Sequence, residues 1–255
     1  MLQDSKGALR LLLLACLVGL MAAEVGSFSP CLSFFHRDTP PTGIVGSGCT
    51  VPVCQRYRNQ YRFASLYDRL HRTPLYSAYL LTAAAGKRPK TLWKYEPQII
   101  RESLSRATFT LTNIVPQKAA SNAGPWARLE EEVGARLKEF CLGPAYVITG
   151  ALPYASGQHW MKNNSRVAVP EYLWSAYCCP AYNASLPKWA SPFFPTYAAV
   201  GRNDPQSGPE IVPVDPKAKA KVRGYDVKRM PLADLEDVLK QRLAMPVTLF
   251  QGQCV

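Results

Sequence analysis

Alternating apolar and polar positions predict a pair of strands early in the chain. Residues 61–68 and 74–80 each alternate in this way and are rich in aromatic side chains, while the intervening residues 69–73 are mainly polar. This pattern is typical of two antiparallel strands joined by a turn. Further strands are predicted at residues 107–114, 144–148 and 193–200.

A longer period predicts two helices. Between Pro125 and Lys138, apolar side chains recur every three to four residues, with acidic side chains early and basic ones late, which matches the helix dipole. A second amphipathic pattern follows Pro231 and extends to Leu243. Helices mixed with alternating strands predict an α+β fold with a central antiparallel sheet. No linker divides the chain, so residues 24–255 are expected to form one domain.

The first 23 residues have the features of a secretory signal peptide. Lys6 and Arg10 precede an uncharged apolar run from Leu11 to Ala23, and Ala22 and Ala23 are suitable residues for cleavage. The run is shorter than the ~20 apolar residues of a spanning helix, although a signal anchor is the alternative. No second stretch of that length follows. We therefore expect a secreted, extracellular protein without a stable membrane span.

Seven cysteines follow the signal peptide, and in a secreted chain they predict disulfides rather than zinc ligands. They are Cys31, Cys49, Cys54, Cys141, Cys178, Cys179 and Cys254. Their odd count leaves one thiol free or bonded to another chain. Asn163 and Asn183 each begin an Asn-x-Ser sequence, which predicts N-glycosylation on surface loops.

The positive charge of the chain indicates which classes of partner it favours. The formal net charge is +12, and removing residues 1–23 takes out Lys6, Arg10 and Asp4, which leaves 28 basic and 17 acidic side chains and a charge of +11. An excess of this size favours polyanionic partners such as nucleic acid, heparin-like sugars or anionic membrane surfaces. Charge alone does not choose among them, and a merely soluble basic protein has a similar composition.

One segment of strand, turn and helix carries a family resemblance. Residues Thr108–Gln117 end in Asn-x-x-Pro-Gln, and Asn122, Trp126 and Glu130 follow at the start of the predicted helix. This segment resembles the DNA/RNA non-specific endonucleases. Several other segments resemble one branch of that family, the endonuclease domain-containing 1 proteins. They are Phe34–Phe35, Thr39–Ile44, Cys54–Tyr57, Tyr61–Ala64, Pro74–Tyr79, Glu96–Gln98, Val147–Gly150 and Trp174–Cys179.

The resemblance implies a ββα-metal nuclease fold, in which one divalent ion, usually Mg²⁺, lies on a helix and binds the scissile phosphate of DNA or RNA. By motif match, Asn122 would be the metal ligand and Glu130, on the same helical face, would orient a metal-bound water. Asn113 would support the site, and a histidine would act as general base. Without the family, Asn122 would be interpreted as a helix N-cap and Glu130 as a solvated first-turn acid.

The chain departs from the family at the general base. The family places an Asp-Arg-Gly-His or Asp-Lys-Gly-His motif between the segment that ends at Gln98 and the strand that begins at Ala107. The eight residues 99–106 contain neither His nor Gly, so one strand of the active-site motif and its base are expected to be missing. The histidines found elsewhere lack this motif; they are His36, His71 and His159.

Three functions are compatible with these observations. The first is a secreted, Mg²⁺-dependent endonuclease that hydrolyses phosphodiester bonds and is impaired by the loss of its base. The second is a catalytically inactive module that still binds nucleic acid or another polyanion, with an affinity that falls steeply with salt. The third is a structural or host-interaction glycoprotein, for which we expect no nucleic-acid binding at physiological salt.

Overall fold

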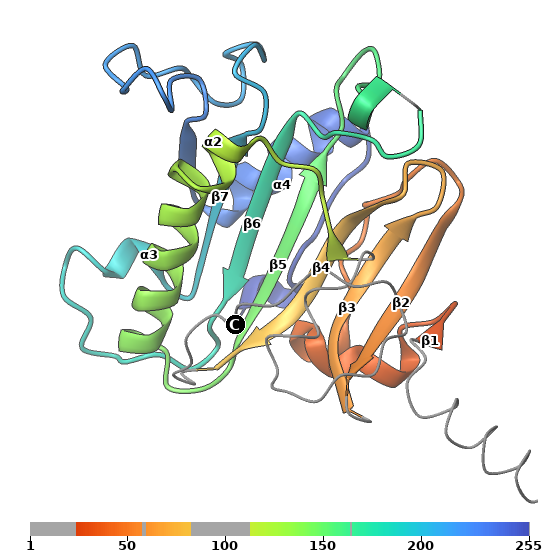
Figure 1. Cartoon of the computed structure of the whole chain (residues 1–255). Coiled ribbons are helices and arrows are strands. Elements are labelled where there is room, and N and C mark those ends of the chain that lie inside the picture. The colour runs from red at the N-terminus through yellow and green to blue at the C-terminus, as the bar shows by residue number, and fades with distance from the viewer. Residues whose placement is uncertain (1–23, 58–59, 83–112, 164, 255) are drawn as a thin grey trace, which may run out of the picture.

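In the described part of the chain, eight strands form one antiparallel sheet whose spatial order follows the sequence order (Figure 1). The computed structural model describes residues 24–57, 60–82, 113–163 and 165–254. The strands are β1 (Glu24–Val25), β2 (Thr50–Tyr57), β3 (Gln60–Asp68), β4 (Thr73–Leu81), β5 (Ala145–Leu152), β6 (Tyr172–Cys178), β7 (Thr196–Arg202) and β8 (Val227–Met230). The helices are α2 (Ala119–Asn122), α3 (Pro125–Phe140) and α4 (Leu232–Leu243). The predicted α+β fold with a central antiparallel sheet is therefore confirmed.

The strands predicted from alternation are found with small shifts. β3 and β4 pair antiparallel, with Ala64 opposite Ala78, so the predicted hairpin is confirmed. The segment 144–148 is the first part of β5, and the apolar segment 193–200 gives β7, which begins only at Thr196 because residues 191–193 form a 3-10 turn. The strand predicted at 107–114 lies outside the described residues except for its last two, and those two are not in a strand.

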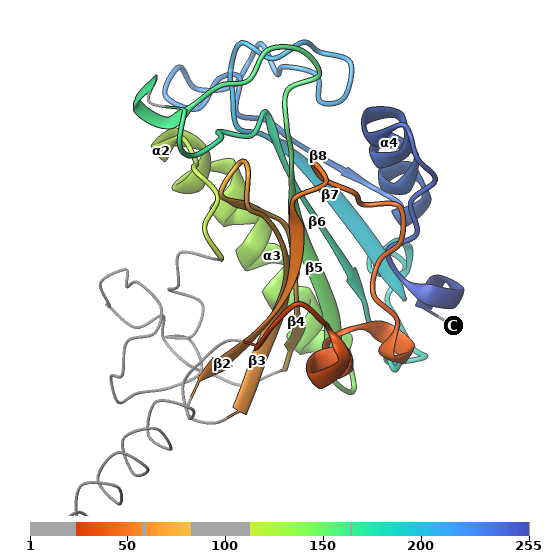
Figure 2. The same cartoon turned by 90° about the vertical axis from the view of Figure 1, so that its right-hand side faces the viewer.

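Helices cover both faces of the sheet (Figure 2). On one face, Trp126 and Leu129 of α3 form a core cluster with Leu173 of β6. On the other face, Leu235 of α4 belongs to a larger cluster that includes Trp174 of β6. Side chains of β6 thus reach opposite cores from neighbouring positions, as the two-residue period of a strand requires. Among the described residues, no helix is long and apolar enough to cross a membrane.

The ring of Trp126 lies directly over the backbone of β7. A Cβ atom at Gly201 would come within 2.7 Å of that ring, so only glycine allows the tryptophan to pack this closely. Trp126 is 3% exposed. The interpretation of this side chain as part of the core is confirmed.

Several connections lie at one end of the sheet because neighbouring strands are antiparallel, and three of them matter for the site. They are the turn 69–72 between β3 and β4, the loop 153–171 between β5 and β6, and the loop 203–226 between β7 and β8. We call this the loop end of the sheet. α2 lies at the same end, where the hydroxyl of Ser121 donates to the carbonyl of Arg202 at 3.2 Å (Figures 1 and 2).

Six of the seven predicted disulfide cysteines are paired. The bridges are Cys31–Cys54, Cys141–Cys179 and Cys178–Cys254. The odd cysteine is Cys49, which is exposed and free. In the described part of the chain, one group of three potential metal ligands was found, made of His36 and the two sulfurs of the Cys178–Cys254 bridge. Sulfurs in a disulfide do not act as thiolate ligands, which agrees with the prediction of disulfides rather than zinc.

Candidate functional site

Asn122, the predicted metal ligand, lies at the end of α2 and not at the start of α3. Its side chain is exposed and has no hydrogen-bond partner among the residues that the structure describes. The N-cap of α3 is Gly124, which makes no side-chain cap. The alternative role of Asn122 as an N-cap is therefore wrong, and no side chain or backbone group of the described residues occupies its amide oxygen.

Glu130 is exposed on α3, and it does not share a continuous helix with Asn122. Gly124 has φ −124° and ψ −118°, which ends the short helix before Pro125 begins the next one. The expectation of one helical face carrying both residues is wrong for this reason. Burial, followed by the negative charge of Glu130, raises the pKa of Tyr79 to about 12. Because Tyr79 belongs to β4, Glu130 faces the β4 side of α3.

The opposite edge of α3 is occupied by an ion pair. Glu132 accepts from Arg136 at 2.7 Å and also from Arg229 of β8. Hydrogen bonds from Arg229, followed by those from Arg136, hold the pKa of Glu132 below its ordinary value although burial opposes them. Glu132 therefore stays ionised and joins α3 to the β8 edge of the sheet.

Asn113 begins the described segment that leads into α2, and it is half-buried there. Its predicted role at the end of a strand rests on residues that lie outside the described part of the chain. The same segment is held further along by Asn203, whose Oδ1 accepts from the backbone N–H of Lys118 at 3.0 Å. The amide nitrogen of Asn203 donates to the carbonyls of Pro116 and Pro170 at 3.0 and 2.8 Å. A fully buried asparagine thus ties the approach to α2 to the loop end of the sheet.

Arg202, the neighbour of Asn203 at the end of β7, organises the long loop that follows. Its side chain is fully buried. The guanidinium donates to the carbonyls of Gly224 (2.9 Å), Gly208 (2.9 Å), Val212 (2.7 Å), Pro205 (3.4 Å) and Ser207. A buried arginine is stable only where its donors are satisfied, and here backbone carbonyls of the loop satisfy them.

Part of this loop is strongly basic. We call residues 215–224 the basic loop, because four exposed cationic side chains lie within it. They are Lys217, Lys219, Lys221 and Arg223. Successive turns order the segment, with the N–H groups of Val222 and Arg223 both donating to the carbonyl of Lys219.

The basic loop contacts the break between α2 and α3. A Cβ atom at Gly124 would lie 3.2 Å from a methyl group of Val222. Asn122 is two residues before that glycine. Lys118 and Arg128, on either side of the break, are also exposed. The exposed Asn122 and several exposed cations therefore lie on neighbouring segments at the loop end, where the loop lies beside α2 in Figure 1.

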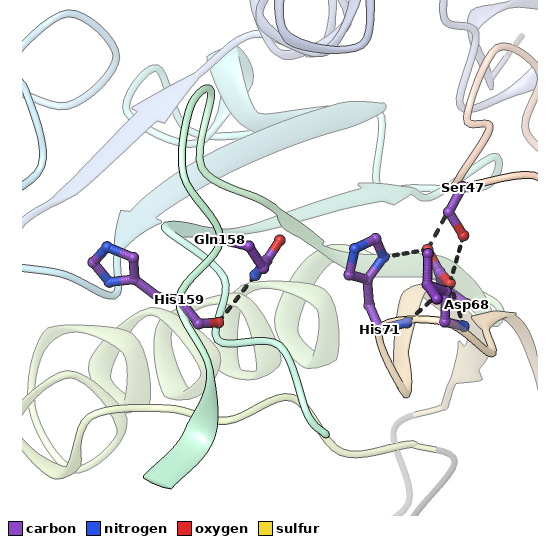
Figure 3. A network of polar contacts seen from close by, with 6 residues as sticks. Ser47, Asp68, His71, Gln158 and His159 are labelled. Atoms are coloured by element: carbon purple, nitrogen blue, oxygen red, sulfur yellow. Dashed lines mark hydrogen bonds and ion pairs between the residues drawn. The ribbon is translucent and has the colours of Figure 1, made fainter. Parts of the chain in front are cut away.

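The histidines occupy three different environments. His36 is buried, and its Nδ1 lies 3.0 Å from the carbonyl of Gln251. His71 pairs with Asp68 (Figure 3), and His159 is exposed and stacks on Tyr154 with 3.9 Å between ring centroids. Within the described residues, none of the three hydrogen bonds to Asn122.

The donor chemistry at Asn122 fits a hard divalent cation. Such ions take oxygen ligands and keep several waters, so a single exposed amide oxygen is a suitable protein ligand. Glu130 supplies a carboxylate on the neighbouring helix.

Sequence reasoning missed both Arg202 and Asn203. Their only local signal is two polar residues directly after the apolar strand, followed by Asp204 and Pro205. A second signal was available for the helix break, because Gly124-Pro125 is a sequence that commonly ends one element and begins a helix.

Known proteins are similar to this chain in sequence. The family model for DNA/RNA non-specific endonuclease matches residues 92–228. Endonuclease domain-containing 1 protein of Mus musculus is 26% identical over 220 residues, which covers 65% of this chain and 43% of the relative. The Homo sapiens protein of that name is 28% identical over 209 residues, covering 63% of this chain and 41% of the relative. The chain thus spans less than half the length of these curated relatives.

A solved structure is also similar. The crystal structure of the EndoG/EndoGI complex, described as showing the mechanism of EndoG inhibition, is 18% identical with a TM-score of 0.45, and the match covers 72% of this chain and 82% of that one. The family model spans more than half of the residues, from the segment before the expected base to β8. The chain therefore belongs to the DNA/RNA non-specific endonuclease family.

Proposed function

We propose that this protein binds nucleic acid through the surface formed by Asn122 and the basic loop, and that its phosphodiester hydrolysis is impaired. The observation that carries the proposal is the contact between Val222 and Gly124, which brings four exposed cations beside the helix end that holds Asn122. Phosphate groups are bound mainly by lysine and arginine side chains.

The fixed position of the basic loop favours binding over mere solubility. Arg202 donates to Gly224, the last residue of the basic loop, and to four carbonyls of the preceding residues 205–212, so the backbone that carries the cations is held at its end before a ligand arrives. A preorganised surface loses less conformational entropy on binding. The net charge of the whole chain, +12, adds long-range attraction for a polyanion.

We propose Mg²⁺ as the divalent ion of this site. When bound, the ion would supply positive charge to the scissile phosphate. The side-chain oxygen of Asn122 would hold it, and Glu130 would orient water near it. Asn203 positions α2 through the backbone of Lys118, and so acts on Asn122 without touching the substrate.

We expect phosphodiester hydrolysis to be impaired because the general base is missing. The family's Asp-Arg-Gly-His motif has no counterpart between Gln98 and Ala107. Loss of a general base typically lowers the rate about 10²–10⁴-fold. His71 does not replace it, because its cavity lies on the α4 face of the sheet whereas α3 and Glu130 lie on the other face.

Cleavage assays test the impairment directly. Purified protein is incubated with plasmid DNA and with RNA in the presence of Mg²⁺, and Asn122→Ala is run beside it. We expect little turnover from either protein. Efficient cleavage that Asn122→Ala abolishes would contradict the claim of impaired chemistry while supporting the site.

We also propose that the protein is secreted and glycosylated. Three disulfides support an oxidising compartment. Asn183 is exposed in the loop after β6, as a glycan acceptor must be. Expression in animal cells should release a protein into the medium whose mass falls on enzymatic removal of N-glycans; a protein retained in cells and unchanged in mass would contradict this.

A further inference from the structure

A cavity of about 180 Å³ lies at the loop end of the sheet, between β4, β5, β6 and α4. Its walls are mostly apolar and include Leu75, Leu152, Trp174, Leu239 and Leu243. Three of these side chains, Leu152, Trp174 and Leu239, are almost fully buried in the core cluster beneath α4. A cavity of roughly 150 Å³ with such a lining accommodates a molecule the size of benzene. This space is separated by the sheet from the surface that carries Asn122.

The polar end of the cavity is built around Asp68. Its side chain is 1% exposed. Its two oxygens accept from the backbone N–H groups of Ser47, Leu70 and His71, from the hydroxyl of Ser47 at 2.9 Å and from the His71 ring at 2.7 Å. Burial alone would raise the pKa of Asp68, but the hydrogen bonds from His71, followed by that from Ser47, outweigh it and the pKa lies below its ordinary value. The carboxylate is therefore ionised at neutral pH.

The ionised carboxylate fixes the tautomer of His71. A carboxylate only accepts hydrogen bonds, so Nδ1 of neutral His71 carries the proton and Nε2 has the free lone pair. Nε2 has no hydrogen-bond partner among the residues that the structure describes. The ring also stacks on Trp160, with 6.0 Å between centroids and 26° between planes. Asp68 and Trp160 together hold the imidazole in one orientation.

Besides Nε2 of His71, the side chain of Gln158 offers a second hydrogen-bond acceptor at this end of the cavity. Figure 3 shows His71 between Asp68 and Gln158, and both His71 and Gln158 line the cavity. The amide nitrogen of Gln158 donates to the carbonyl of His159 at 3.0 Å, which leaves its Oε1 as an acceptor. Two acceptors at the end of an apolar space favour a ligand that donates a hydrogen bond.

We infer that this cavity binds a small, mostly apolar molecule with a hydroxyl head group, a phenol or a short alcohol, whose O–H donates to Nε2 of His71. The apolar walls hold the body of the ligand, and Gln158 lies beside its head group. The site is independent of nucleic-acid binding. Asp68 is a positioning residue, since it sets the imidazole without reaching the ligand.

Phenol and anisole test the inference as matched probes, because they share an aromatic ring and differ in the donor. NMR titrations follow the indole N–H signals of the tryptophans and the ring nitrogens of His71. We expect phenol to shift the signals of Trp174 and Trp160 but not that of Trp126, which lies on the opposite face. We also expect phenol to bind roughly tenfold more tightly than anisole, the value of one hydrogen bond.

Two variants separate the cavity from the nucleic-acid surface. His71→Phe keeps an aromatic ring against Trp160 and should bring the affinity for phenol down to that for anisole. Asn122→Ala should leave phenol binding unchanged. If His71→Phe does not fold, the wild-type protein alone still tests the inference, because phenol should shift the Nε2 signal of His71 and anisole should not.

Three results would overturn the inference. The first is that neither the Trp174 nor the Trp160 signal shifts at about 10 mM phenol, a high concentration for a ligand of this size. The second is that phenol and anisole bind with equal affinity. The third is that His71→Phe still binds phenol more tightly than anisole.

Discussion

Replacing Arg202 with methionine should release the basic loop from the sheet. Methionine retains the apolar stem of the side chain but none of its donors. The hydrogen bonds to the carbonyls of Val212 and Gly224 are buried, whereas those to Gly208, Pro205 and Ser207 are only partly buried. The contact with Pro205, at 3.4 Å, is also too long to contribute much.

The magnitude follows from the two buried bonds. A hydrogen bond from a charged donor is worth about 1.5–3 kcal/mol, and water can replace the donors at the three partly buried carbonyls. Removal of the desolvation cost of a buried guanidinium offsets part of this loss. We therefore expect Arg202→Met to lower the free energy of unfolding by about 2–4 kcal/mol, measured as a shift in the urea midpoint.

Trypsin reports on the loop itself, because it cleaves after lysine and arginine. In the native protein, the ordered turns of the basic loop should protect Lys217–Arg223 from cleavage. In Arg202→Met, fragments that end within this segment should appear at least about tenfold faster. This rate is expected when the free energy of local opening of the loop falls by more than about 1.4 kcal/mol. Mass spectrometry identifies these fragments, so cleavage elsewhere does not interfere.

Arg229→Met is the matched control. It also removes a guanidinium, but the ion pair of Arg229 with Glu132 is at the surface and should contribute under about 1 kcal/mol. If Arg202→Met matches this control in urea midpoint and in cleavage of the basic loop, then Arg202 does not hold the loop and the account of the site is wrong.

Two further predictions concern the core and the acid stability. Gly201→Ala should destabilise the protein by about 1–3 kcal/mol because the new methyl group would meet the ring of Trp126. Gly134→Ala, which has open space around it, should instead stabilise α3 by about 0.5–1 kcal/mol. Urea unfolding of the two variants tests this, and equal effects on stability would contradict the packing of Trp126 on Gly201. The lowered pKa of Asp68 means that its ionised form stabilises the folded state above about pH 4 and that this contribution is lost as the pH falls through the folded-state value. The stability difference between wild type and Asp68→Asn should therefore shrink from pH 7 to pH 2, and a constant difference would show that the charge is not involved.

Elements defined by local periodicity could be predicted from the sequence. α3 and α4 each have one buried and one exposed face, so their apolar residues recur with the helical period. The β3–β4 hairpin could be predicted because its two strands alternate in sequence and are joined by a mainly polar turn. β6 was not predicted because it lies in the middle of the sheet and six of its seven residues are buried, which removes the alternation. β2 was not predicted because Pro52 lies within it. Among the described strands, β2 is next to the sheet edge and pairs on that side with the two-residue β1, and a proline is tolerated in such a place.

The site could be predicted only in part, for a related reason. Asn122 and Glu130 belong to a contiguous motif, and the motif alone identifies them. The roles of Asn203 and Arg202 depend on carbonyls that are set by the conformation of distant loops; the bond from Asn203 to Pro116 joins residues 87 positions apart. The pairing of His71 with Asp68 was likewise hidden, because in the sequence the two residues are simply polar members of a turn.

The central claim is that nucleic acid binds at the basic loop beside Asn122, and the salt dependence of DNA binding tests it most directly. Fluorescence anisotropy of a labelled duplex is measured over a range of salt concentrations for wild type and for two variants of equal charge. K219Q/K221Q removes two cations of the basic loop, and K188Q/K240Q removes two exposed lysines elsewhere, on the loop after β6 and on α4. Each phosphate contact contributes about 0.9 to the slope of log affinity against log salt concentration. We predict that the loop variant loses about two units of slope and that the other keeps the wild-type slope; equal slopes in all three proteins, or no binding by wild type at physiological salt, would contradict the account.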